Sequence, residues 1–89
     1  MNWVVYWSEE AEDELTNLLS TATDPSLIAV AAVQLEQDLA IKPVEASETR
    51  SENYRVIFCL PLVAFFVLHS EQKAVQVIHI RAAWKRHQQ

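Results

Sequence analysis

The chain has 89 residues, a length that makes one small domain with a modest core, and we expect that domain to span 1–89. Its net charge of −5 argues against non-specific nucleic-acid binding, which rests on many Lys and Arg contacts. The apolar runs are too short to span a membrane, and the lone Cys59 excludes an internal disulfide. An early acidic run in place of a signal peptide, together with a free thiol, predicts a cytoplasmic protein.

The first two expected elements are a strand over residues 2–7 and a helix that follows it. The strand segment is rich in aromatic and β-branched residues. Ser8 is a good helix N-cap, and the carboxylates just after it suit the positive end of the helix dipole. Helical spacing is followed by Ala11, Leu15, Leu18, Leu19 and Ala22. The acidic residues between them read as a solvated face, so we expect no metal site.

A second helix is predicted to begin at Asp24-Pro25 and to end at Lys42-Pro43. Asp24 is a favourable N-cap and proline suits the first helical position, whereas the residue before a proline is pushed out of the α region. The link between the helices is short, so they should form an antiparallel hairpin. The polar segment 44–53 reads as a loop, in which Arg50 would pair with a nearby Glu.

The last part of the chain predicts a three-strand meander. Pro61 separates strands over 54–60 and 62–69, a turn follows at 70–73, and a final strand covers 74–80. Strict alternation would place Ile78 and Ile80 on one side of that strand, and Val77 and His79 on the other. With the helical hairpin, this order predicts an α+β fold with two helices on an antiparallel sheet.

Both faces of the predicted sheet are apolar, but two helices cover only one. One set of side chains includes Tyr54, Val56 and Phe58, and the other includes Ile57 and Cys59. The sequence leaves open which set faces the helices. A bare apolar face predicts a partner segment or a homodimer.

Three ordered segments resemble the RelE/ParE toxin superfamily of bacterial toxin–antitoxin modules. Residues 3–15 are similar to its opening strand and its S-x-x-A-x-x-x-L helix entry. Residues 43–50, followed by Tyr-Arg-Val-Ile-Phe at 54–58, are similar to its loop and "YRV-I/L-Y/F" strand. Residues 75–81 are similar to its closing strand and arginine. The likeness covers nearly the whole chain.

The resemblance implies a toxin that is neutralised by a cognate antitoxin and that needs no cofactor. RelE-like members cleave mRNA on the ribosome, whereas ParE-like members inhibit DNA gyrase. In an RNase of this type, Arg55 and Arg81 would stabilise charge on the phosphate. The alternative reading of each arginine is a solvated or ion-paired sheet residue.

The chain departs from the RelE pattern in charge and in its end. It is acidic, and Arg81 is followed by Ala82, Ala83 and Trp84. Trp84 could stack on a base or cap the sheet edge, but it cannot exchange a proton, which leaves His87 as the remaining acid/base candidate. We therefore expect a toxin-like protein without an RNase site. The alternative is a non-toxic interaction module or homodimer with a degenerate toxin fold.

Overall fold

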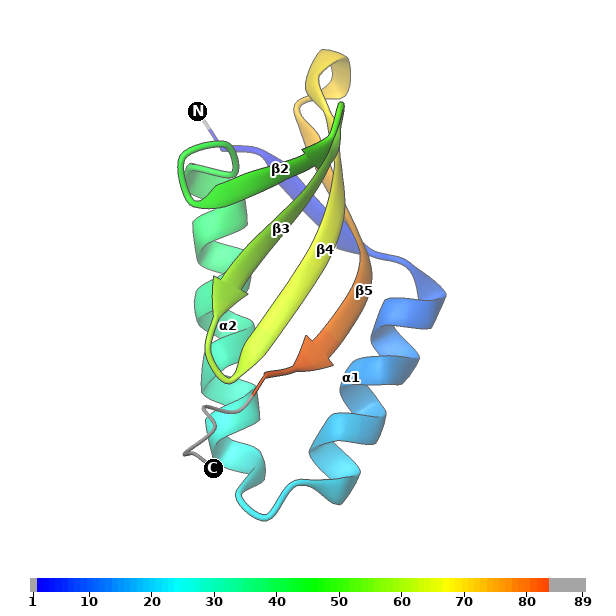
Figure 1. Ribbon diagram of the computed structural model, residues 1–89, viewed down its shortest axis with the longest axis vertical. Coiled ribbons are helices and arrows are strands. Elements are labelled where there is room, and N and C mark those ends of the chain that lie inside the picture. The colour runs from blue at the N-terminus through cyan, green and yellow to red at the C-terminus, as the bar shows by residue number, and fades with distance from the viewer. Residues whose placement is uncertain (1, 84–89) are drawn as a thin grey trace.

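The computed structural model describes residues 2–83 and places two helices on one face of a five-stranded sheet (Figure 1). The sheet order is β1-β5-β4-β3-β2, in which β1 is parallel to β5 and all other pairs are antiparallel. The α+β prediction is confirmed. The elements are β1 Val4–Trp7, α1 Glu9–Thr21, α2 Pro25–Ile41, β2 Ser47–Ser51, β3 Tyr54–Cys59, β4 Leu62–His69, a 3-10 turn Ser70–Gln72, and β5 Ala74–Ala82.

The helices begin where the sequence predicts. The Ser8 hydroxyl accepts a hydrogen bond from the Ala11 backbone N–H at 3.0 Å, which satisfies one of the free donors of the first turn. The Asp24 carboxylate accepts from the Ser26 N–H in the same way, and Pro25 occupies the first helical position. Neither described helix is long and apolar enough to cross a membrane.

The core lies between the helices and the sheet side chains of the Ile57 set. Ile57 on β3 pairs in register with Ala64 on β4, which pairs with Ile80 on β5, and all three are buried. Phe66 is fully buried among them. The helices contribute Ala11, Ile28, Ala31, Leu35 and Leu39. The question left open by the sequence is thus answered: the set with Ile57 and Cys59 faces the helices.

A β-bulge in β5 corrects the predicted alternation of that strand. Phe66 pairs with Val77 but Phe65 pairs with His79, so Ile78 is an extra residue with no partner on β4. The bulge keeps Ile80 on the helix side together with Val77, and it moves His79 to the opposite side. The prediction that paired Val77 with His79 on one face was wrong, because strict alternation holds only without an inserted residue.

The prediction of a loop over 44–53 was also wrong, because Ser47–Ser51 forms the edge strand β2. This strand is polar on both faces and carries none of the alternation that marks a half-buried strand. It is short, charged and irregular, with a register shift between Thr49 and Ser51, as is common for an edge strand.

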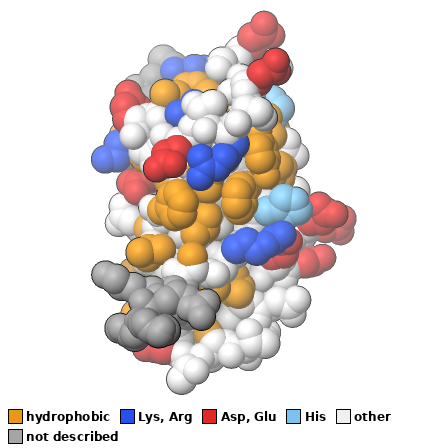
Figure 2. Space-filling model, viewed as in Figure 1, with side chains coloured by type: hydrophobic (Ala, Val, Ile, Leu, Met, Phe, Trp, Pro, Cys, Tyr) orange, Lys and Arg blue, Asp and Glu red, His pale blue; other side chains and the backbone are white. Residues whose placement is uncertain are grey.

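The face of the sheet turned away from the helices, here called the open face, is crossed by no other described element (Figure 1). Its residues pair directly across the strands: Glu48, Tyr54, Val56, Phe58, Val63, Phe65, Val67, Gln76, His79 and Arg81. Figure 2 shows apolar side chains gathered across its middle with charged groups beside them.

Side chains of the open face pack against one another and bury part of its apolar surface. Val56 and Val63 are buried, and the rings of Tyr54 and Phe65 stack at 6.0 Å between centroids. Phe58 remains half exposed, at 51%. The unpartnered apolar surface is therefore concentrated around β3 and the adjoining turn.

Candidate functional site

Arg55 lies on the helix side of the sheet, at the edge formed by β2. It pairs in register with Phe66 on one side and Thr49 on the other. Its guanidinium donates to the Ser47 hydroxyl at 2.7 Å, to the Thr49 hydroxyl at 2.7 Å and to the backbone carbonyls of Val44 and Ser47 at 3.2 and 3.4 Å. These bonds join β3 to β2 and to the turn after α2. Arg55 therefore helps to hold β2 and this turn in place.

We expect Arg55→Ala to lower the free energy of unfolding by about 1–2 kcal/mol, because the hydrogen bonds that hold β2 are lost. Arg55→Lys should recover little, since a single ammonium lacks the planar fork that reaches both hydroxyls. Urea unfolding followed by circular dichroism measures both. The matched control is Arg50→Ala, because the polar contacts of exposed Arg50 within residues 2–83 are with exposed Glu48 at 3.5 Å and with the Thr49 carbonyl. Equal stability of the Arg55 and Arg50 variants would contradict this role.

Arg81 lies on the open face, where it pairs in register with Val63. Its Nη1 donates to Glu14 on α1 at 2.7 Å, and His79 Nδ1 lies 3.3 Å from the same carboxylate oxygen. The second Glu14 oxygen accepts the backbone N–H of Ile80 at 2.8 Å. Glu14 therefore holds α1 against the edge of β5 that β1 does not reach, and it fixes the position of Arg81.

The electrostatics of Glu14 follow from these contacts. Burial alone raises the pKa of its carboxyl, but the Ile80 N–H, Arg81 and His79 together outweigh burial, and the pKa of Glu14 lies below its ordinary value. The carboxylate is charged at neutral pH. The sequence did not single out Glu14, because it belongs to an acidic helix start that is typical of a solvated surface. The one sign that Glu14 lies near the sheet is its position four residues before Leu18, which belongs to the apolar stripe of the helix.

The two candidate arginines are not brought together. Arg55 pairs with Phe66 and Arg81 with Val63, and residues three apart on one strand point to opposite faces. Trp84 and His87 lie outside the described residues. Within residues 2–83, no group of three His, Cys, Asp or Glu is arranged to hold a metal ion.

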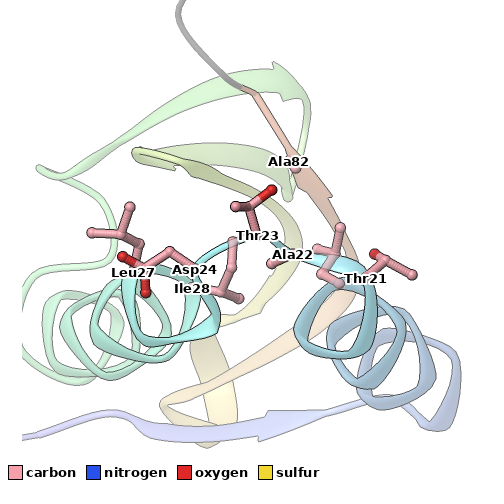
Figure 3. Close-up of a pocket in the computed structure, with 8 residues that line it drawn as sticks. Thr21, Ala22, Thr23, Asp24, Leu27, Ile28 and Ala82 are labelled. Atoms are coloured by element: carbon pink, nitrogen blue, oxygen red, sulfur yellow. The ribbon is translucent and has the colours of Figure 1, made fainter.

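A hollow of about 470 Å³ opens where the helical hairpin meets the end of β5 (Figure 3). Leu18, Ala22, Leu27 and Ile28 supply most of its apolar lining. Among the described residues that line it, Asp24 is the ionisable one, and its carboxylate already accepts from Ser26 as the helix cap. The described part of the lining thus holds no acid–base pair for chemistry.

Several solved structures share the architecture of this chain. The RelBE2 toxin–antitoxin complex of Mycobacterium tuberculosis matches with a TM-score of 0.77 at 15% identity, over 92% of this chain and 99% of the matched chain. The chromosomal ParDE system of P. aeruginosa matches at 0.68 and 15%, over 92% and 97%. The isolated E. coli RelE toxin matches at 0.68 and 17%, over 96% and 88%. The chain has the RelE/ParE toxin fold.

The fold that the sequence resemblance implied is thereby confirmed. No protein-family model matches the chain, and no curated protein matches it in sequence. Within the RelE/ParE fold, this chain presents Arg81, His79 and the apolar open face on one side of the sheet. It turns Arg55 to the other side.

Proposed function

We propose that this chain is the toxin of a type II toxin–antitoxin pair, and that it acts by binding its target, with DNA gyrase as the candidate, instead of cleaving RNA. The RelE/ParE fold over more than nine-tenths of the chain supports the toxin assignment. The open face, apolar around half-exposed Phe58, supports an antitoxin that covers it.

The position of Arg55 is the observation that favours target binding over RNA cleavage. Its guanidinium is occupied by four acceptors on the helix side, so it is not directed at a phosphate on the open face. Arg81 is on the open face but is paired with Glu14. RNA cleavage needs several groups converging on one phosphate, and these two arginines do not converge.

Cleavage of ribosome-bound mRNA is the second candidate function. It is favoured by the proximity of Arg81 and His79 on the open face, a cation beside a proton-exchanging ring. A non-toxic interaction module built on the same fold is the alternative from a different class. The open face would then serve partner binding alone.

Induced expression of the chain in bacteria tests the proposal. We expect growth arrest, loss of negative plasmid supercoiling, and intact mRNA when 5′ ends are mapped after induction. Phe58→Glu should relieve the arrest, because it places a charge in the apolar part of the open face. Asn17→Glu on the exposed side of α1 is the control and should arrest growth like the parent chain.

Each alternative has its own outcome. New mRNA 5′ ends that disappear in Arg81→Ala would replace gyrase inhibition by RNA cleavage. Normal growth with abundant folded, soluble protein would contradict a toxin and favour the interaction module. A cognate antitoxin should restore growth when it is co-expressed.

A further inference from the structure

The outward side of α2 carries three adjoining hollows that meet at Val33. Their volumes are about 430, 380 and 310 Å³. Val33 lines all three, and Glu36 lines two. We call this surface the Val33 groove; its principal lining residues are Trp3, Val5, Trp7, Val30, Val33 and Glu36.

The floor of the Val33 groove is apolar and accessible. Val30 is 68% exposed and Val33 is 57% exposed, and their spacing of three places them side by side on the helix. Val5 and Trp7 on β1, and Trp3 just before it, line the hollows beside α2 and are partly buried. A two-element apolar surface of this kind is typical of a binding groove for a polypeptide.

Among the residues that the structure describes, the ionisable side chains lining the Val33 groove are Glu12 and Glu36, and both are acidic. The Trp7 indole N–H donates to Glu36 Oε2 at 2.7 Å, which holds this carboxylate over the apolar floor and leaves Oε1 for a second donor. Lys73 lies 4.7 Å from the ring centre of Trp3, at one end of the groove.

We propose that the Val33 groove binds a partner polypeptide segment whose apolar side chains are flanked by Lys or Arg. The apolar residues would cover Val30 and Val33, and a cation would pair with Glu36. A second copy of this chain fits less well, because a two-fold contact would set the acidic groove against itself. The groove is on the helix side of the molecule, so the proposal does not rest on the function assigned to the open face.

Titration of the isotope-labelled full chain with designed peptides tests the proposal by NMR. The probe is an amphipathic helix of Leu and Lys of about 14 residues, long enough to form a helix on binding. The matched control peptide carries Glu in place of Lys. We expect the Lys peptide alone to bind, with the largest shifts at Val33, at Glu36 and at the Trp7 indole N–H, whose signal Trp7→Phe identifies.

Neutral substitutions separate apolar contact from general charge attraction. The double variant Val30→Gln/Val33→Gln should weaken binding about tenfold, a loss that corresponds to about 1.4 kcal/mol. Leu60→Gln, at an equally exposed apolar residue on the β3–β4 turn, should leave affinity unchanged. Glu36→Gln keeps an acceptor for Trp7 and should weaken binding about threefold while reducing its dependence on salt.

Three outcomes would overturn the proposal. The first is equal binding of the Glu peptide, and the second is unchanged affinity in the double variant. The third is self-association of the free chain in sedimentation that the double variant abolishes, since a second copy would then occupy the groove. Thermal unfolding of each variant verifies that it is folded, which is expected because Val30 and Val33 are exposed.

Discussion

Phe66→Ala should lower the free energy of unfolding by about 3–5 kcal/mol, the largest loss expected from a single substitution in this chain. Phe66 is 0% exposed and lies on β4 at the centre of the core between the sheet and the helices. Removing its ring leaves a cavity that close-packed neighbours refill only in part. Since a domain of this kind is stable by about 5–15 kcal/mol, the variant should be close to unfolding at room temperature.

Phe58→Ala is the matched control, because it removes the same ring from the other side of the same sheet. Phe58 is 51% exposed on the open face, so its removal opens no enclosed cavity. Urea unfolding of the two variants should give a clear difference in midpoint, with Phe58→Ala near the parent chain. Similar midpoints would mean that the helices do not cover the face that carries Phe66.

Glu14→Ala should lower the free energy of unfolding by about 1–3 kcal/mol, because it leaves the N–H of Ile80 unpaired at the edge of β5. The contacts with Arg81 and His79 disappear with it. Glu12→Ala on the same helix is the control, since the Glu12 side chain is exposed. Hydrogen exchange should show faster exchange at Ile80 in the Glu14 variant and unchanged exchange there in the Glu12 variant.

The same carboxylate gives stability a defined dependence on pH. The pKa of Glu14 is lower in the folded chain than its ordinary value of 4.5. Its contribution is therefore present in full above that ordinary value and is lost as the pH falls through the lower, folded value. Glu14→Gln cannot lose a charge at low pH, so it lacks this part of the fall in the free energy of unfolding. The difference in that free energy between the parent and Glu14→Gln should therefore shrink from pH 7 to pH 3. A constant difference would contradict the assignment.

Much of the fold follows from local patterns in the sequence. The helix starts at Ser8 and Asp24 and the division of β3 from β4 at Pro61 were predicted because capping and proline chemistry act over a few residues. Two-sided hydrophobicity correctly indicated that one sheet face is not covered by any element within residues 2–83. The choice of face could not be predicted, since it depends on which side chains fit against Leu35 and Leu39.

The parts that were missed depend on contacts between distant residues. β2 has no hydrophobic period of its own and is held by Arg55, which follows it in the chain. The side of the sheet on which Arg55 lies could not be predicted either, because no local rule indicates that Ser47 and Thr49 accept hydrogen bonds from its guanidinium. Glu14 and Ile80 are far apart in sequence, so their contact appears only once the sheet is assembled.

The extra residue in β5 means that the side of the sheet on which Arg81 lies is set by the bulge and not by the chemistry of Arg81 itself. A deletion of Ile78 would remove the bulge but leave His79, Ile80 and Arg81 opposite Phe65, Ala64 and Val63, so Ile80 and Arg81 would keep their sides. If β5 instead kept Ile78 and lost the bulge, Ile78 would pair with Phe65, the guanidinium of Arg81 would enter the core and Ile80 would meet water. Arg81 thus reaches the open face because β5 uses three residues, Val77 to His79, where β4 uses two.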